Sequence, residues 1–235
     1  LAVSPDHRLL AYTVDTDGNE EYELHVMDLE RREIIDSGIN GLSYGLVWAN
    51  DSQTLFMVLT DEARRPDRVI RHVVGTDSQQ DKTIFNEEDE KFWVGIGGTR
   101  SERYVVVGSE SKMSSEYWLL DADSPDGELV IVEPRREGHE YRISHQGDRL
   151  LILTNWNALD FRLMETPVDQ LGSHNWEEIV PHREGVRLED IDAFENFMVI
   201  TERREGVPML RIRDHKQGDE FEIPMSEPVF EAGSG

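Results

Sequence analysis

The sequence contains no cysteine among its 235 residues. Disulfide bonds, thiolate metal sites and cysteine nucleophiles are therefore excluded. Because disulfides are common in secreted proteins and rare in the cytosol, the absence of cysteine leads us to expect a cytoplasmic protein. No apolar run approaches the roughly 18 residues of a membrane-spanning helix, so we also expect no membrane partner.

Basic residues are scarce. The 24 Lys and Arg residues stand against 49 Asp and Glu residues, which gives a net charge of −25. A field of this sign repels nucleic acid and anionic membrane surfaces, because their phosphates are bound by Lys and Arg. We therefore expect no nucleic-acid partner and favour cationic partners such as basic peptides, although solubility or a salt-adapted source would also explain the charge.

The chain contains five copies of a short segment rich in apolar and β-branched residues. The copies are anchored at residues spaced 46, 49, 46 and 47 apart, namely Leu9, Leu55, Tyr104, Leu150 and Phe197. A fixed period of about 40 to 50 residues built from β-type segments is typical of propeller blades. The repeat therefore predicts an all-β fold, a β-propeller of four-stranded antiparallel blades, with about five blades present.

The second repeat illustrates the predicted blade. Strands are expected at residues 44–48, 54–59, 68–74 and 82–85, separated by turn-forming residues at 50–52, 61–67 and 75–78. In the other repeats, the third strands are expected at residues 22–27, 116–120, 161–164 and 209–212. The fourth strands are expected at residues 33–35, 129–132, 178–180 and 220–223. No segment shows a sustained helical period.

The two ends of the sequence affect the blade count. Only seven residues precede the strand that starts near Arg8, so we expect the innermost strand of the first blade to be missing. Residues 228–231 look like the innermost strand of a further blade. We hypothesise that Val229 and Phe230 pair with residues 9–14 and close a five-bladed ring, because an open arc would leave two unpaired sheet edges.

A catalytic motif occurs once. Residues 41–45 fit the G-x-S-x-G pattern of the α/β-hydrolase nucleophile elbow, with Ser43 in the nucleophile position. That chemistry requires a strand, a sharp turn and a helix, whereas a blade strand and a turn follow Ser43 here. We interpret the match as coincidental and predict no catalytic, cofactor-binding or metal-binding residue and no cofactor.

The histidines do not form a recognisable metal motif. None of the eight is spaced i, i+2 or i+4 from another, so each is interpreted as structural: His7, His25, His72, His139, His145, His174, His182 and His215. The acidic run 15–21 resembles a calcium loop, but Val26 replaces its bidentate Glu. We expect a solvated hairpin loop there and a charged connection between blades at residues 87–90.

Two further groups of polar residues are assigned to loops. The arginine pairs Arg64–Arg65, Arg135–Arg136 and Arg203–Arg204 are expected to be exposed ion-pair partners, although loop arginines can also bind carboxylates. Four acidic residues follow the second strands, namely Asp15, Asp61, Glu110 and Glu202. We interpret them as loop caps rather than as the paired carboxylates of a glycosidase.

Several runs together resemble a known family. They are Ser4-Pro5-Asp6, Trp48-Ala49-Asn50-Asp51, Arg65-Pro66, Arg71-His72, Gly75-Thr76, Ser114-Ser115-Glu116 and Leu120-Asp121-Ala122-Asp123. Over essentially its whole length, the chain resembles the propeller domain of oligopeptidase B-like members of the prolyl oligopeptidase family of serine peptidases. The Trp-Ala-Asn-Asp and Arg-Pro, Arg-His, Gly-Thr runs are the most specific of these.

The resemblance implies a function. Members of the family pair a seven-bladed propeller with an α/β-hydrolase domain that follows it and holds the Ser-Asp-His triad; the propeller limits substrates to short peptides. Oligopeptidase B members cleave after Arg or Lys. We therefore expect residues 1–235 to be a truncated propeller whose partners are its missing hydrolase domain and short basic peptides. The fragment alone should be inactive.

Two other interpretations of the chain's function remain open. The chain could be a stand-alone propeller that binds peptides or proteins, for which both sheet edges would have to be sealed. It could also be a five-bladed glycosidase that uses inward carboxylates from among Asp15, Asp61, Glu110 and Glu202.

Overall fold

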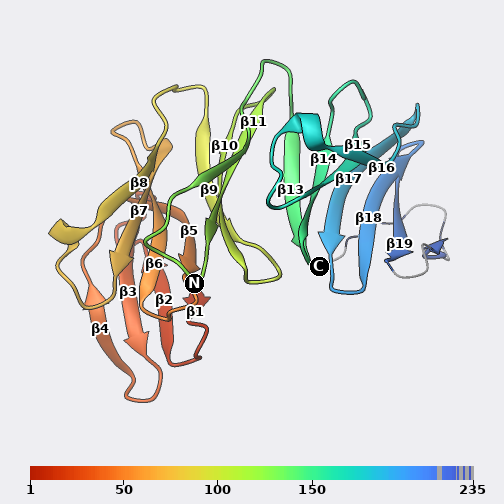
Figure 1. Cartoon of the computed structure of the whole chain (residues 1–235). Helices are drawn as coiled ribbons and strands as arrows, with labels where there is room; N and C mark the ends of the chain where they lie inside the picture. The colour runs from red at the N-terminus through yellow and green to blue at the C-terminus, as the bar shows by residue number, and fades with distance from the viewer. Residues whose placement is uncertain (216–218, 226, 228–229, 231–232, 234–235) are drawn as a thin grey trace. The chain divides into compact units, whose positions relative to one another are not determined.

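The computed structural model describes residues 1–215, 219–225, 227, 230 and 233. Within these residues the chain forms 20 strands in five four-stranded antiparallel sheets and two short 3-10 turns (Figure 1). Every strand predicted within residues 9–223 overlaps a strand of the structure. The predicted all-β architecture of four-stranded propeller blades is therefore confirmed.

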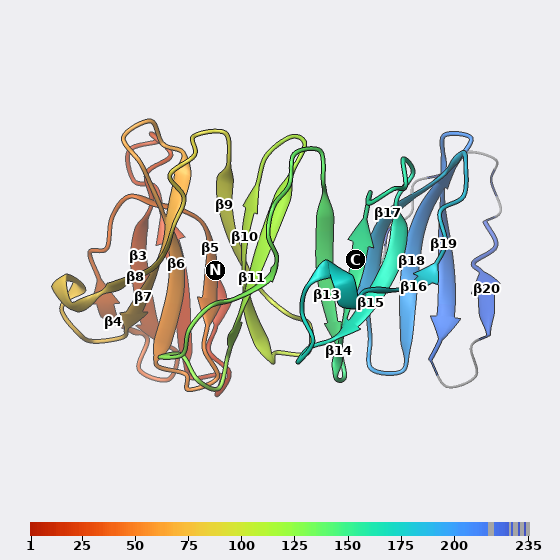
Figure 2. The same cartoon turned by 45° about the horizontal axis from the view of Figure 1, so that its top comes forward.

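Each sheet is one blade and is built from consecutive segments (Figures 1 and 2). The first contains β1 (Ala2–Val3), β2 (Leu9–Val14), β3 (Glu23–Asp28) and β4 (Glu33–Ser37). The second contains β5 (Leu42–Trp48), β6 (Thr54–Thr60), β7 (Pro66–Val73) and β8 (Lys82–Asn86), with the 3-10 turn η1 (Ser78–Gln80). The third contains β9 (Trp93–Gly98), β10 (Tyr104–Glu110), β11 (Ser115–Asp121) and β12 (Val130–Glu133).

The last two blades follow the same plan. The fourth contains β13 (Tyr141–Gln146), β14 (Arg149–Thr154), β15 (Arg162–Pro167) and β16 (Glu177–Val180), with the 3-10 turn η2 (Ser173–Asn175). The fifth contains β17 (Val186–Ala193), β18 (Phe197–Arg204), β19 (Val207–Asp214) and β20 (Glu220–Glu222).

The strand order places certain loops together. In each sheet the strands lie in chain order and alternate in direction. The loop after the second strand and the segment after the fourth strand therefore leave the sheet at the same end. We call this the loop end of a blade.

The first blade corrects one expectation. Its innermost strand was expected to be missing, but β1 pairs with β2 at Leu10 and Ala11. The short strand is held because Trp48 donates its indole N–H to the Ala2 carbonyl at 3.0 Å and a turn beginning at Ser4 reverses the chain. The hypothetical strand at 228–231 includes Val229, which lies outside the described residues; Phe230 belongs to no strand.

Apolar clusters lie between neighbouring blades. Leu24, Leu42 and Met57 belong to a cluster shared by the first and second blades. Another cluster, which includes Val58 and Val107, joins the second and third blades, and one that includes Leu163 and Ile200 joins the fourth and fifth. The inner strands are covered on both faces, which explains why β6 is a nearly continuous apolar run rather than an alternating one.

The chain divides into two compact units. Unit 1 contains Leu1–Lys112 and Tyr117–Ile131, and unit 2 contains Met113–Glu116 and Val132–Gly235. The first and second blades lie in unit 1, and the fourth and fifth lie in unit 2. Among the described residues, no helix is long and apolar enough to cross a membrane.

Candidate functional site

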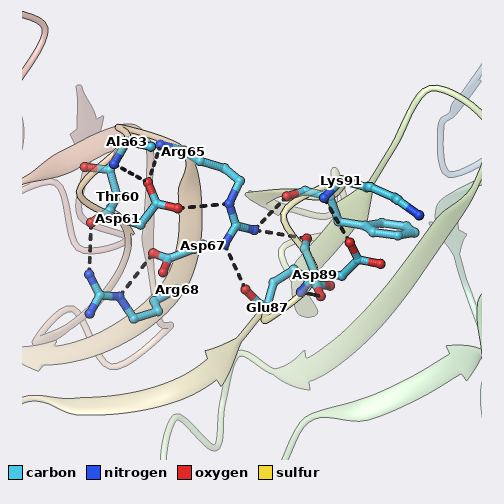
Figure 3. A network of polar contacts seen from close by, with 10 residues as sticks. Thr60, Asp61, Ala63, Arg65, Asp67, Arg68, Glu87, Asp89 and Lys91 are labelled. Atoms are coloured by element: carbon cyan, nitrogen blue, oxygen red, sulfur yellow. Dashed lines mark hydrogen bonds and ion pairs between the residues drawn. The ribbon is translucent and has the colours of Figure 1, made fainter.

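The best-defined polar network lies at the loop end of the second blade in unit 1. Arg65, in the loop after β6, places its guanidinium between that loop and the segment connecting β8 to β9 (Figure 3). Its Nε donates to Asp61 Oδ2 at 3.0 Å. The Nη1 group donates to the Phe92 carbonyl at 2.9 Å and the Asp89 carbonyl at 3.2 Å, and Nη2 donates to the Glu87 carbonyl at 3.2 Å. Arg65 therefore fixes both segments at once.

Asp61 closes the loop that carries Arg65. Its Oδ1 accepts the backbone N–H groups of Ala63 and Arg65, each at 2.9 Å. These hydrogen bonds stabilise the ionised form of Asp61 and so lower its pKa below the ordinary value. The backbone N–H of Arg65 makes the largest contribution. The predicted role of Asp61 as a loop cap is confirmed. Arg65, in contrast, is not the exposed partner expected from the sequence, because only 11% of its side chain is accessible.

The acidic run 87–90 lies in the connection between β8 and β9, as predicted, and Glu88, Asp89 and Glu90 are exposed; Glu87 is the exception. Glu87 is only 3% exposed. Its carboxylate accepts the Ser109 hydroxyl at 2.6 Å and the Asp89 N–H at 2.9 Å. A buried carboxylate of this kind persists because neighbouring donors satisfy it. The connection between the second and third blades is therefore held by two residues. Glu87 binds Ser109 on β10, and Arg65 binds the backbone carbonyls of the connection.

We expect replacement of Arg65 by Met to loosen the connecting segment. The Glu87, Asp89 and Phe92 carbonyls would lose a charged donor, which is worth about 1.5–3 kcal/mol for a single bond of this type. Amide hydrogen exchange of residues 87–92 should therefore accelerate by about tenfold or more. The matched control is Arg64→Met, because Arg64 is half-exposed and does not contact this segment through any bond described here. Equal exchange in the two variants would contradict this role for Arg65.

The loop end of the first blade carries an acidic loop that is closed by Asp15. Asp15 accepts backbone N–H groups from Asp17, Gly18, Asn19 and Glu20, of which Glu20 contributes most to lowering the pKa of Asp15. Asp15 is therefore a loop cap, as predicted. Arg64 crosses from the second blade to the Asn19 carbonyl. The predicted hairpin loop at 15–21 is confirmed, since it connects β2 to β3.

Two tyrosines meet beside this acidic loop. The Tyr22 hydroxyl donates to the Tyr44 hydroxyl at 3.0 Å, and this bond, together with nearby acidic groups such as Asp15, raises the pKa of Tyr22 to about 12. Tyr44 is 76% exposed. Ser43 precedes it within β5, so the G-x-S-x-G run lies in a strand and not in a strand–turn–helix elbow. The coincidental interpretation of that motif agrees with this placement.

Sequence reasoning missed the partners of His72. This histidine on β7 is fully buried and has two carboxylates against its ring, with Nε2 2.9 Å from Asp36 Oδ2 and Nδ1 2.7 Å from Asp81 Oδ1. Asp36 belongs to the first blade and also accepts the Gly75 N–H. His72 is thus structural, as expected, and it ties the second blade to the first.

The neighbouring Arg71 ties the second blade to the third. Its Nη1 donates to the Pro125 carbonyl at 2.8 Å, and Nη2 lies 2.7 Å from Asp126. Among the described residues, no group of three His, Asp or Glu side chains could hold a metal ion. The contacts of Arg65, Arg71 and His72 connect loops and blades within unit 1.

In unit 2 one expectation is wrong. Glu202 was interpreted as a loop cap, but it lies inside β18 and is fully buried. It is surrounded by Arg183, Arg204 and Arg211, with the last two at 3.2 Å. Burial of a carboxylate requires such cationic partners. Glu110 lies at the end of β10 in unit 1. Its carboxylate accepts the Tyr117 hydroxyl. In the bonds described, Glu110 therefore binds a side chain and does not cap backbone N–H groups as predicted.

The other arginine pairs include the exposed ion-pair partners that were predicted. Arg203 meets Glu189 with Nε at 2.6 Å and Nη2 at 3.1 Å. Arg136, whose side chain is 51% accessible, pairs with the buried Glu133 and also places its guanidinium 4.3 Å from the centre of the Trp156 ring. Glu133 is 3% exposed. Arg136 is thus held by a cation–π contact and a carboxylate together.

Comparison with known proteins identifies the family. The family model for the N-terminal β-propeller domain of prolyl oligopeptidase matches residues 1–234. Dipeptidyl aminopeptidase BI of Pseudoxanthomonas mexicana is 36% identical over 89% of the chain and 29% of the relative. Protease 2 of Moraxella lacunata is 32% identical over 97% of the chain and 33% of the relative. The chain therefore spans about a third of the length of these relatives.

Solved structures agree with this assignment. Oligopeptidase B of Leishmania major matches 97% of the chain and 34% of that structure with a TM-score of 0.89 and 29% identity. Oligopeptidase B of Trypanosoma brucei, in a closed form with covalently bound antipain, matches 97% of the chain and 33% of that structure with a TM-score of 0.88 and 26% identity. The chain belongs to the prolyl oligopeptidase family, as an N-terminal β-propeller domain similar to that of oligopeptidase B.

Proposed function

We propose that this chain is the substrate-gating domain of a serine oligopeptidase that cleaves short peptides after Arg or Lys. The observation that carries the proposal is the match of the propeller family model to residues 1–234, together with the likeness to oligopeptidase B structures. In this proposal the propeller admits short peptides to a hydrolase domain and excludes folded proteins.

The charge of the chain supports basic substrates. The net charge of −25 creates a field that attracts cationic peptides and raises their rate of encounter. The lowered pKa values of Asp15 and Asp61 keep both loop-end carboxylates ionised well into the acidic range. Specificity itself would come from contacts at the scissile residue, since a long-range field changes encounter rates more than it discriminates between side chains.

The proposal assigns catalysis to a partner domain. The relatives are about three times the length of the chain they match, and in the family reading the Ser-Asp-His triad belongs to an α/β-hydrolase domain outside residues 1–235. Ser43 is half-buried within strand β5, a position unsuited to a nucleophile that must be presented on a sharp turn.

We expect the 235-residue chain alone to leave a fluorogenic Arg-Arg substrate intact. The same substrate should be hydrolysed by the full-length product of its gene, with kcat/KM at least about 100-fold higher than for a matched substrate with Ala at the scissile position. Hydrolysis by the isolated chain that disappears in Ser43→Ala would contradict the assignment of catalysis. Equal kcat/KM for the Arg and Ala substrates would contradict the proposed specificity.

Raising the salt concentration separates the contribution of charge. Electrostatic encounter weakens as salt screens the field, so kcat/KM for the Arg-Arg substrate should fall more steeply with salt than kcat/KM for the neutral substrate. Parallel salt dependences would remove the acidic field from the explanation.

A further inference from the structure

Trp93 is the most exposed of the five tryptophans in the chain, and 61% of this residue is accessible to solvent. It is the first residue of β9, the first strand of the third blade, and it lies in unit 1 (Figure 1). Its indole is therefore within reach of a ligand. A single exposed apolar residue is ordinary in a soluble protein, so the surroundings of Trp93 decide what the indole can bind.

The strand pairing places a carboxylate beside the indole. Trp93 lies directly opposite Glu110, the last residue of β10. The Cβ atoms of directly opposed residues in an antiparallel pair are about 4.5–5.5 Å apart, on the same face of the sheet. Glu110 is exposed, and one of its carboxylate oxygens accepts the Tyr117 hydroxyl. The other oxygen makes no bond or ion pair among those described, so it can accept a donor from a ligand.

The same face of β9 is bare next to these two side chains. Gly95 and Gly97 share the face with Trp93, because successive residues of a strand point to opposite faces. A Cβ added at either glycine would find no atom of a non-neighbouring residue within 4 Å. Glycine inside a strand often marks a place where a ligand or another backbone approaches closely. An extended peptide could therefore lie along the backbone of β9.

Both groups are held in place before a ligand arrives. Arg65 donates to the Phe92 carbonyl at 2.9 Å, in the residue directly before Trp93. Tyr117, which binds Glu110, is itself only 8% exposed. A ligand that contacts groups already fixed in this way causes a smaller loss of conformational freedom when it binds.

The chemistry of this face fits a cation. Among aromatic side chains, the face of an indole is the best partner for a guanidinium or ammonium group. A carboxylate beside the indole can pair with the same charge. The connection that leads into β9 adds three exposed acidic residues, Glu88, Asp89 and Glu90. This charge would repel an anionic ligand and attract a cationic one.

We propose that Trp93 and Glu110 form a subsite for the cationic side chain of a bound peptide. The guanidinium of an arginine, or the ammonium group of a lysine, packs on the indole and donates to the unengaged oxygen of Glu110. The peptide backbone runs along the bare glycine face of β9. That the ligand is a peptide rests on the proposed function, whereas the affinity of the two side chains for a guanidinium does not.

The test uses the whole 235-residue chain labelled with ¹⁵N-tryptophan, in which loss of one indole N–H signal in Trp93→Phe identifies Trp93. The probe is acetyl-Ala-Arg-Ala amide, and its control carries citrulline, a neutral group of the same shape, in place of Arg. We expect the Arg peptide to shift the Trp93 signal in a saturable manner. Its Kd should be about tenfold lower than that of the citrulline peptide, because the neutral group loses both the cation–π and the ion-pair attraction.

Two variants separate the local contact from the general acidic field. Glu110→Gln keeps an acceptor for the Tyr117 hydroxyl and removes the charge, so it should raise the Kd of the Arg peptide about threefold. The matched control is Glu30→Gln, which removes one charge from an exposed residue in the turn between β3 and β4 and should leave that Kd unchanged. Equal Kd values for the two peptides, equal effects of the two variants, or no shift of the Trp93 signal would each overturn the proposal.

The subsite and the proposed function can fail separately. If the Arg peptide binds at Trp93 and the full-length protein cleaves Arg and Ala substrates equally well, the subsite stands and the proposed specificity falls. If the full-length protein prefers Arg substrates and the Arg peptide does not shift the Trp93 signal, the subsite is wrong and the proposed function is unaffected.

Discussion

Replacing His72 with Ala should lower the free energy of unfolding by about 3–5 kcal/mol, because two poorly exposed carboxylates would lose the partner that they share. The His72 side chain is fully buried, and the Asp36 and Asp81 side chains beside it are only 9% and 10% exposed. Without the imidazole, two carboxylates would remain close together in a poorly solvated position. We expect a large decrease in the urea midpoint, measured by circular dichroism.

A matched control and a second variant sharpen the test of His72. His7 is exposed and has a backbone φ of 60°, so His7→Asn, which tolerates that conformation, should change stability by less than about 0.5 kcal/mol. Adding Asp36→Asn to His72→Ala should recover part of the loss, because one unpaired buried charge is removed. A His72→Ala variant as stable as the control would mean that the contacts with Asp36 and Asp81 contribute little.

Replacing Glu202 with Gln should lower the free energy of unfolding by about 3 kcal/mol or more. The substitution keeps the size of the side chain and removes the charge that three arginines share. The Glu202 side chain is not accessible to solvent (0%), and the Arg211 side chain beside it is only 12% accessible. Arg204 and Arg211 would then keep only their more exposed partners, Glu222 and Glu220.

The control for Glu202 is its neighbour Glu222. Both carboxylates bind Arg204, but Glu222 is 45% exposed, so Glu222→Gln should cost only about 0–1 kcal/mol. Removing Arg211 in the Glu202→Gln background should cost less than it does in the native chain, because the two residues are directly coupled. Similar thermal midpoints for Glu202→Gln and Glu222→Gln would contradict the central place of Glu202 in this cluster.

The strands could be predicted because each blade repeats the same local signals. The segment from Thr54 to Leu59 is apolar enough to be recognised without its neighbours, and the turns around Ser52 and Gly75 mark its hairpins. Strand β1 could not be predicted in this way. It has only two residues, and it is held by pairing with β2 and by the indole of Trp48, a residue 46 positions away from Ala2.

The polar clusters were missed for a related reason. His72 meets Asp36 from the preceding blade, 36 positions away, and Glu202 meets Arg183, 19 positions away. No local pattern reports such pairs. The signal that could have pointed to them was the presence of a charged or titratable residue inside an otherwise apolar strand, because such a residue needs a partner when buried.

The runs that carry the family resemblance have a structural explanation. Arg65 holds the loops of the second blade to the next connection, Arg71 reaches Pro125 and Asp126, and His72 and Gly75 both bind Asp36. The Arg-Pro, Arg-His and Gly-Thr runs therefore join the second blade to both of its neighbours. The resemblance rests on residues that hold blades together, which is why it identified the propeller without identifying a substrate contact.

Sequencing the gene beyond the codon for Gly235 is the measurement that would test whether this propeller gates a serine peptidase. We expect two further blade repeats and then a strand, a Gly-x-Ser-x-Gly turn and a helix, the features of a hydrolase nucleophile elbow. A stop codon directly after Gly235 would contradict it. The stand-alone peptide- or protein-binding propeller would then be the better account of the chain.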